Sequence, residues 1–383
     1  MKILIGFLTS FCLLTFGVHG QQAFLSTPIA GEYGKDYIIV NYVDWSFDSI
    51  QDANCGTKTY NGHEGTDFVI AGFEEMATGV NVKAAAGGVV TFVQDGLFDQ
   101  ETGGDVSKLF GNYICIKHPN LYYSYYAHLK SGSIKVQSGD EVVDGQVLAQ
   151  VGSSGNSTDP HLHFELWYDS LQLVDPFEGD CGNPTTNWMN PINYDTSFAI
   201  WKSSLSGLNP SLNEMRFGLL DRTQILLDID EYTTYWNLQY GLRKGDVTTI
   251  KWYNDSTDVF TYELTYDKDY WFYYFNSYIF PTTTGLCDNC KVEYYMNNQL
   301  IETKFFQTVV SVDSKEQNLS FNPQSLEQFL NSKTDIKANI YTRSGQGLGS
   351  WRSQNNTLTP GIYLVEMINK NSGKRKVGKL VIR

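Results

Sequence analysis

Most histidines of this chain lie in short motifs whose residue types can bind a metal ion. His63 and Asp67 stand four residues apart, His128 closes an aromatic run, and His161 and His163 form a pair. A catalytic Zn²⁺ takes about three protein ligands from imidazole and carboxylate groups and keeps a fourth position for water, whose pKa it lowers to about 7. His63, Asp67 and one histidine of the pair would complete this ligand set, which predicts a zinc hydrolase.

The segment after Pro160 has the alternation of a half-buried β-strand. The apolar residues Leu162, Phe164 and Leu166 alternate with the polar residues His161, His163 and Glu165. Because residues i and i+2 of a strand point to the same face, about 6.6 Å apart at about 3.3 Å per residue, we expect both imidazoles on one face. One imidazole can then hold the metal while its neighbour transfers protons.

Three motifs together resemble the M23 metallopeptidases, the lysostaphin-like or LytM-type endopeptidases that cut peptidoglycan cross-bridges. They are the His63 to Asp67 motif, Tyr126-Ala127-His128-Leu129 and His161-Leu162-His163-Phe164. Between them, residues 138–148 and 151–155 are similar to the glycine-punctuated hairpins that lead into the HxH strand of that family. The resemblance covers about residues 30 to 180 and implies an antiparallel β-sheet peptidase core.

The resemblance also implies a role for each motif residue. His63, Asp67 and His163 would ligate one zinc ion per chain, while His128 and His161 would flank the reacting water and the scissile carbonyl. An uncoordinated imidazole with a pKa near 6.5 can accept the water proton and pass it to the leaving amine. Which of His128 and His161 is the base and which stabilises the oxyanion is left open by the sequence.

Two further side chains have open interpretations. Glu165 lies two residues beyond His163 on the same strand face, where it either orients an imidazole or is a solvated carboxylate. His118 stands before Pro119 at an expected turn, so we interpret it as a structural residue.

The first residues have the pattern of a secretory signal peptide, predicted over residues 1–20. A short basic start at Lys2 precedes an apolar stretch from Ile3 to Val18, and small residues before Gln21 offer a cleavage site. Nothing later in the chain reaches the about 20 apolar residues that a transmembrane helix needs. We therefore expect a secreted or cell-surface protein that passes through the periplasm.

The cysteines agree with export to an oxidising compartment. Cys55 and Cys181 bracket the peptidase core and could join its ends, while Cys287 and Cys290 form an isolated CxxC for which a local disulfide is the expectation. Cys115 lies in an apolar run and is expected to be a buried free thiol.

The composition is acidic and rich in aromatic residues. The net charge of −14 argues against nucleic acid as a partner and against electrostatic docking to anionic membranes, but it permits uncharged, glycine-rich peptide substrates. The 25 Tyr and 22 Phe, in short alternating runs, indicate a mainly β chain.

The pattern of strands predicts three units after the signal peptide. Residues 21–200 form the peptidase domain, and residues 205–312 form a β-sandwich of immunoglobulin-like type, because short strands alternate there with turns. The aromatic run from Tyr270 to Phe275 either lines a ligand surface or packs in the core. Residues 313–383 form a small β domain.

This last domain resembles the C-terminal sorting domain of the type IX secretion system. The resemblance lies in residues 339–346, residues 358–365 and the final strand with its basic flank, residues 374–383. It implies that the type IX secretion machinery is a partner and that the tail is removed or used for surface attachment. An ordinary strand edge protected by lysines is the alternative.

These observations predict a secreted zinc metalloendopeptidase that hydrolyses peptide bonds in peptidoglycan cross-links or bridges. One alternative is an extracellular M23 protease that acts on glycine-rich proteins. Another is a non-catalytic module that binds cell-wall peptides, against which the complete set of five histidine and aspartate residues argues.

Overall fold

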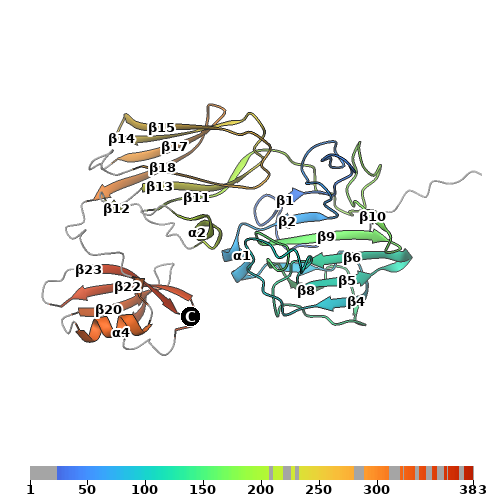
Figure 1. Cartoon of the computed structure of the whole chain (residues 1–383), viewed down its shortest axis with the longest axis horizontal. Coiled ribbons are helices and arrows are strands. Elements are labelled where there is room, and N and C mark those ends of the chain that lie inside the picture. The colour runs from blue at the N-terminus through green and yellow to red at the C-terminus, as the bar shows by residue number, and fades with distance from the viewer. Residues whose placement is uncertain are drawn as a thin grey trace, which may run out of the picture.

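The computed structural model shows a mainly β chain, as predicted. It describes residues 24–206, 210–218, 226–228, 233–279, 289–309, 320–321, 323–332, 336–341, 347–351, 358–359, 361–370 and 375–382. The predicted signal peptide lies outside these residues. Within them the sheets form three units along the chain, which can be followed in Figure 1.

The first unit is built on an eight-stranded antiparallel sheet of order β1-β2-β9-β6-β5-β4-β7, with β10 paired to β9. Its strands are β1 (Ile38–Asn41), β2 (Thr66–Val69), β4 (Gly88–Gln94), β5 (Tyr113–Lys117), β6 (Tyr122–Ala127), β7 (Glu141–Val142), β9 (His161–Tyr168) and β10 (Gln172–Val174). A two-stranded sheet of β3 (Asn81–Lys83) and β8 (Val147–Gln150), the helix α1 (Phe73–Thr78) and the 3-10 turn η1 (Pro119–Leu121) complete the unit.

The alternation predicted for the HxH strand is present in β9. Leu162, Phe164 and Leu166 are fully buried in the main hydrophobic core. The side chains of His163 and Glu165 lie on the opposite face, where they are also buried. Burying three large apolar side chains stabilises the fold by about 1.5–3 kcal/mol each, so this strand is held in one register and its polar face is placed reproducibly.

Two of the cysteine predictions are confirmed. A disulfide joins Cys55 to Cys181, and Cys115 is a buried free thiol. Cys290 is disulfide-bonded, but Cys287 lies outside the described residues, so the pairing of these two stays a prediction.

Two facing sheets form the second unit. A three-stranded sheet consists of β11 (Ala199–Ser206), β13 (Thr233–Tyr240) and β16 (Tyr273–Ile279), and a five-stranded sheet of order β12-β18-β17-β14-β15 faces it. The strands of the second sheet are β12 (Leu226–Asp228), β14 (Val247–Asn254), β15 (Thr257–Thr265), β17 (Cys290–Met296) and β18 (Gln299–Val309). Tyr235 and Phe275 of one sheet pack against Trp252 and Phe306 of the other in one apolar core.

The aromatic run of residues 270–275 packs largely into hydrophobic clusters. Phe275 belongs to the core between the two sheets, Trp271 and Phe272 pack against the first unit, and Tyr270 and Tyr273 pack around Tyr266. These contacts agree with the core interpretation, while Tyr270, Trp271 and Phe272 also line a pocket between the first two units.

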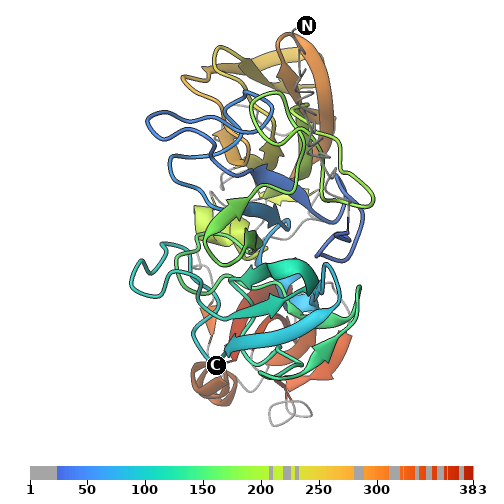
Figure 2. The ribbon, with the colours of Figure 1, turned by 90° about the vertical axis from the view of Figure 1, so that its right-hand side faces the viewer.

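The first two units are joined by specific contacts. The Trp271 indole N–H donates a hydrogen bond to the carbonyl of Thr57 over 3.0 Å, and the Thr57 hydroxyl donates to Asp269 over 2.6 Å. Figure 2 shows the loop after β1, drawn in blue, reaching alongside the second unit. Trp271 also packs against Ile38 and Val69 at the edge of the main sheet.

The third unit is a five-stranded sheet of order β19-β23-β22-β20-β21 packed against one helix. Its elements are β19 (Ser320–Phe321), α4 (Pro323–Ser332), β20 (Ile336–Tyr341), β21 (Gly347–Ser350), β22 (Gly361–Asn369) and β23 (Arg375–Ile382). The division of the chain into the predicted domains stays a prediction.

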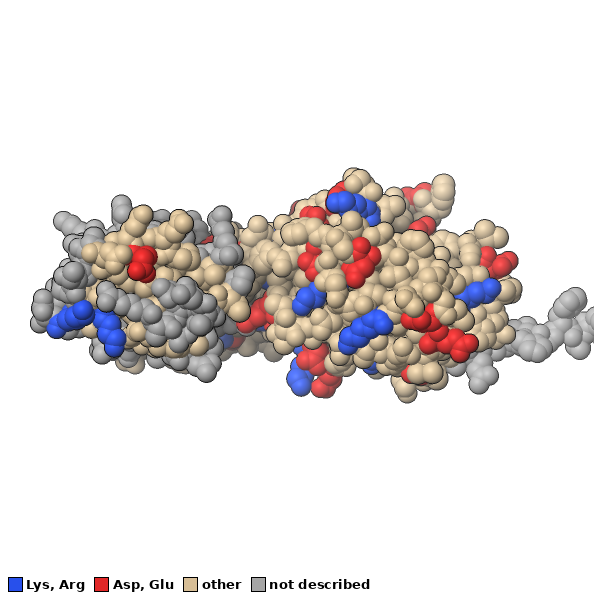
Figure 3. Space-filling model, turned by 90° about the horizontal axis from the view of Figure 1, so that it is seen from below, with Lys and Arg blue, Asp and Glu red and all other residues tan. Residues whose placement is uncertain are grey.

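Acidic and basic side chains are interspersed on one face of the first unit. Figure 3 shows Asp and Glu side chains among Lys and Arg over the face of the first unit that is seen from below. No helix among the described residues is both long enough and apolar enough to cross a membrane.

Candidate metal centre and active site

Three of the predicted site residues converge on one buried point. The Nε2 atom of His63, the Nδ1 atom of His163 and a carboxylate oxygen of Asp67 lie within 4.8 Å of one another. The two ring nitrogens are 3.2 Å apart, and Asp67 Oδ1 lies 3.2 Å from His63 Nε2 and 2.9 Å from His163 Nδ1. Ligand atoms of a tetrahedral zinc with bonds of about 2.0–2.1 Å are about 3.3 Å apart, so the spacing fits that ion.

Strand pairing brings the cluster together. Asp67 of β2 and His163 of β9 are direct register partners, so their side chains leave the same face of the sheet. His63 precedes β2 in a turn that folds back over this face. Gly65 allows this turn to lie close to the ring of His163, because a Cβ atom on residue 65 would lie only 2.6 Å from Cε1 of His163.

Neighbouring groups orient each ligand. His63 Nδ1 lies 2.7 Å from the carbonyl of Tyr42, and His163 Nε2 lies 2.9 Å from Glu165 Oε1. The carbonyl of Tyr42 and the carboxylate of Glu165 each accept the N–H of the nitrogen that faces them. The other nitrogen of each ring faces the cluster and can give its lone pair to a cation that replaces a proton there. Asn41 donates a hydrogen bond to Asp67 Oδ2 over 2.8 Å. The structure therefore places Glu165 as the partner of an imidazole and not as a solvated carboxylate.

The cluster has the electrostatics of a cation site. Burial opposes the charge of Asp67, yet His63, His161 and His163 hold the pKa of this carboxyl well below its usual range. Burial likewise opposes protonation of His163, but Asp67 and Glu165 raise the pKa of that imidazole to about 10. Two buried carboxylates around one imidazole therefore favour positive charge at this point.

His128 and His161 stand beside the cluster with one ring nitrogen each left free. Their ring centroids are 4.6 Å apart, and His161 Nε2 lies 3.6 Å from Asp67 Oδ1. His128 Nδ1 lies 2.7 Å from the carbonyl of Ser154, and His161 Nδ1 lies 2.8 Å from the carbonyl of Asp159. These carbonyls fix the N–H on Nδ1 and leave Nε2 of both rings as acceptors.

Burial disfavours the protonated form of both of these imidazoles. Burial lowers the pKa of His128 well below its usual value, with His161 and His163 acting in the same direction. Burial also lowers the pKa of His161, although Asp67 opposes the shift. His128 adopts a φ of 60°, which is uncommon outside glycine and is typical of constrained residues at functional sites.

His118 lies away from the cluster. It is buried between η1 and the main sheet, with Nδ1 2.9 Å from the carbonyl of Gly87 and Nε2 2.7 Å from the hydroxyl of Ser124. The structural interpretation of this histidine agrees with these contacts.

Sequence reasoning missed the groups that hold the site residues. Asn41 and the carbonyl of Tyr42 come from β1 and its end, and no motif marks them. Asp159 stands directly before Pro160 and the HxH strand, and this position is only a weak signal of its role. Arg216, whose guanidinium contacts the Asp159 carboxylate, lies far along the chain. Only strand pairing and the packing of the second unit bring them together.

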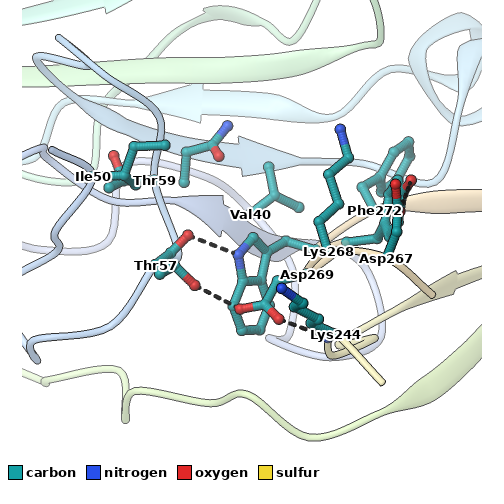
Figure 4. A pocket seen from close by; sticks show the side chains of 12 residues that line it. Val40, Ile50, Thr57, Thr59, Lys244, Asp267, Lys268, Asp269 and Phe272 are labelled. Atoms are coloured by element: carbon teal, nitrogen blue, oxygen red, sulfur yellow. Dashed lines mark hydrogen bonds between the residues drawn. The ribbon is translucent and has the colours of Figure 1, made fainter. Parts of the chain in front are cut away.

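A pocket of about 600 Å³ lies at the junction of the first two units. The first unit contributes Val40, Asn41, Ile50, Thr57 and Thr59, and the second contributes Lys244 and residues 267–272. Figure 4 shows Thr57 hydrogen-bonded to the loop of the second unit, with Lys268 extending past Val40. Asn41 connects the pocket to the cluster, because its amide also binds Asp67.

A buried His, Asp, His cluster on a β-sheet, flanked by two further imidazoles, is the arrangement of a metal-dependent hydrolase. Residues 61–176 match the family model of Peptidase family M23, the family that the motifs resemble. The match includes all five residues of the site.

The chain is similar to several curated relatives over about 110 of its residues. It is 33% identical over 115 residues to "Peptidoglycan DD-endopeptidase ShyC" of Vibrio cholerae, a match that covers 30% of this chain and 22% of the relative. It is 36% identical over 107 residues to "DD-carboxypeptidase/endopeptidase Mpg" of Neisseria meningitidis, covering 28% and 20%. The chain thus spans about a fifth of the length of the curated relatives it matches.

Two solved structures are similar to part of this chain. The catalytic domain of lysostaphin from Staphylococcus simulans is 25% identical, with 36% of this chain and 85% of that chain covered and a TM-score of 0.25. A zinc-containing peptidase from Vibrio cholerae is 27% identical, with 40% and 39% covered and a TM-score of 0.28.

Proposed function

We propose that this protein is a zinc-dependent endopeptidase that cleaves peptide bonds in the cross-links or bridges of peptidoglycan. The observation that carries the proposal is the geometry of the five site residues. Three ligand atoms converge on one point, and two further imidazoles present free Nε2 atoms beside them. The names of the relatives support peptidoglycan as the substrate class.

The donor set fits zinc. Two imidazole nitrogens and one carboxylate oxygen are ligands that zinc accepts in catalytic sites, where a fourth position stays open. When bound, the ion would supply Lewis-acid chemistry by polarising the scissile carbonyl and making an attacking water more acidic. Glu165 and the carbonyl of Tyr42 would keep His163 and His63 in the tautomers that such an ion needs.

We assign proton transfer and oxyanion stabilisation to His128 and His161. A neutral Nε2 atom can take the proton of the attacking water, and the resulting imidazolium can deliver it to the leaving amine. The second imidazole can stabilise the negative charge that develops on the carbonyl oxygen. Both rings are held at Nδ1 by backbone carbonyls, so neither must reorient before it acts.

The pocket beside Asn41 gives the substrate peptide a place to lie. Among the described residues, neither Lys244 nor Lys268 forms an ion pair with a carboxylate, and both line this pocket. Stem peptides of peptidoglycan carry free carboxylates. We therefore expect these lysines to pair with a substrate carboxylate, which an acidic chain of net charge −14 would otherwise repel.

We further propose that the protein is exported by its N-terminal signal peptide and crosses the outer membrane by type IX secretion, with residues 313–383 as the sorting signal. The motifs in residues 339–346, 358–365 and 374–383 support this route. Deleting the tail should leave the purified peptidase active and trap it in the periplasm of the native host. Normal appearance of the truncated protein outside the cell would refute the route.

Digestion of purified sacculi tests the function. The full chain should release soluble peptides whose new termini, identified by mass spectrometry, define the scissile bond, while His163→Ala should release none. A parallel digest of a glycine-rich protein separates the two substrate classes. If the glycine-rich protein is cleaved and the sacculi are not, the peptidoglycan assignment is overturned. Binding to sacculi without cleavage of either substrate would indicate a binding module.

A further inference from the structure

The helix α2 (Leu212–Arg216) connects the second unit to the active-site face of the first. Phe217, directly after the helix, stacks on Phe73 of α1 with ring centroids 4.1 Å apart, while Met215 packs against Trp236 of β13. Figure 1 shows α2 between the second unit and α1. A capping box formed by Ser211 and Glu214 fixes the start of the helix. The helix is therefore held on both sides.

Arg216, the last residue of α2, contacts the loop that leads into the HxH strand. Its Nε atom lies 2.9 Å from Asp159 Oδ1, and its Nη2 atom donates to Asp159 Oδ2 over 3.0 Å. Both side chains are 14% exposed. The hydrogen bond from Nη2 and the ion pair at Nε together restrain the position of the carboxylate and favour its charge. Burial raises the pKa of Asp159 to about 6, and Arg216 opposes that shift and favours the ionised form.

Asp159 in turn holds His161. Its backbone carbonyl accepts the hydrogen bond from His161 Nδ1 at 2.8 Å, and Pro160 between them restricts the backbone. The carbonyl of Pro160 accepts from the amide of Ile70 over 3.2 Å, which attaches the loop to the end of β2. The orientation of the His161 ring thus depends on the position of Asp159, and Arg216 fixes that position.

We propose that Arg216 is a positioning residue for His161, so that the unit following the M23 segment completes the active site. Arg216 lies outside residues 61–176, and it touches none of the three candidate metal ligands. The inference depends on the proposed role of His161 in peptide cleavage. Its structural part, the control of the His161 ring by Arg216, can be tested independently of that role.

Loss of Arg216 should change the rate of catalysis and not metal binding. Without the guanidinium, the buried carboxylate of Asp159 has no cationic partner and must take up a proton or move toward solvent. Either response displaces the carbonyl that holds His161. Loss of such an orienting partner costs about 10- to 100-fold in activity, and displacements of about 1 Å are sufficient for that.

The test compares two arginine variants of the full chain. Arg216→Met removes the positioning contact. Arg243→Met is the matched control, because Arg243 also belongs to the second unit and lies at the same junction, where it pairs with Asp269 over 3.2 Å and stacks on Trp271. We expect Arg216→Met to lower kcat on a cross-linked muropeptide about 10- to 100-fold with KM and zinc content unchanged. Arg243→Met should keep the kcat of the wild type.

A second readout does not require activity. In protein labelled with ¹⁵N-histidine, the Nδ1–H signal of His161, assigned by its loss in His161→Asn, should persist in the wild type and Arg243→Met and should shift or exchange in Arg216→Met. If Arg216→Met fails to fold, Arg216→Lys, which keeps the charge but lacks the planar guanidinium that donates to Asp159 Oδ2, takes its place. Equal kcat values in the two arginine variants, or an unchanged His161 signal, would overturn the proposal. A wild type that cleaves no peptide refutes the proposed function, and the signal still decides the role of Arg216.

Discussion

Asp67 and His163 face each other as register partners on β2 and β9, with the carboxylate Oδ1 2.9 Å from the imidazole Nδ1. Because adjacent antiparallel strands place such a pair on one face, the sheet itself sets the spacing of two candidate metal ligands. The third candidate ligand, His63, comes from a turn that can lie close to His163 because it contains Gly65. The site therefore depends on the pairing of β2 with β9.

The first prediction concerns the metal. Replacing His163 with Ala should reduce zinc from about one ion per chain to a small fraction and abolish cleavage, because one of three ligands is lost. Elemental analysis of the purified variant measures this. His118→Asn, a buried histidine outside the cluster, is the control and should keep its zinc. Full zinc occupancy in His163→Ala would remove His163 from the ligand set.

The second prediction separates catalysis from binding. His128→Ala and His161→Ala should each retain zinc and the fold but lose about 100-fold or more in kcat, because each removes a group for proton transfer or oxyanion stabilisation. Steady-state kinetics on a cross-linked muropeptide, with zinc content measured in the same samples, checks this. Turnover at the rate of the wild type in either variant would exclude that histidine from the mechanism.

The third prediction concerns the partner of His163. Glu165→Gln removes the negative charge that faces His163 Nε2. The imidazole then becomes a weaker electron-pair donor to zinc, and the zinc affinity should fall about 10-fold. Competition with a zinc chelator measures the affinity. Glu64→Gln makes the same change of charge at an exposed position beside His63 and should leave the affinity nearly unchanged. Equal affinities in the two variants would contradict the orienting role.

The fourth prediction is a pH dependence of stability. Burial lowers the pKa of His118 below its ordinary value of 6.5. Above that pH the imidazole is neutral in both the folded and the unfolded states, so it adds no pH dependence. Below it the unfolded chain binds a proton that the folded protein does not, so the free energy of unfolding falls as the pH falls, by up to about 1.4 kcal/mol per pH unit.

The variant His118→Asn should lack this contribution. Urea unfolding at several pH values between 5 and 7.5 should show the wild type losing stability more steeply than the variant as the pH decreases. The other histidines titrate in both proteins, so their effects cancel in the difference. Parallel pH profiles would contradict a depressed pKa for His118.

The fifth prediction tests the pocket. Lys268→Met should raise KM about two- to fivefold for a peptide with a free carboxylate, the effect expected for one solvent-exposed ion pair, and should leave kcat unchanged. The same variant and the wild type should have equal KM values for a peptide whose carboxylates are amidated. An increase in KM of the same size for both peptides would show that Lys268 does not bind the carboxylate.

The sequence alone was sufficient for the mainly β class, the M23 resemblance and the five candidate site residues, because local pattern carries these features. The alternation after Pro160 predicted the two faces of β9, and a period of two leaves little choice of face for His161 and His163. The Cys55 to Cys181 disulfide also followed from the positions of the cysteines around the core.

Only the tertiary structure could decide which groups hold the site residues. Asn41, the carbonyl of Tyr42 and Arg216 reach the site through strand pairing and unit packing, and neither process leaves a periodic signal in the chain. Local spacing also could not choose between the two interpretations of Glu165, because the choice depends on burial. Residues far apart in sequence meet because apolar faces must be buried, and the polar contacts that result are specific to the folded state.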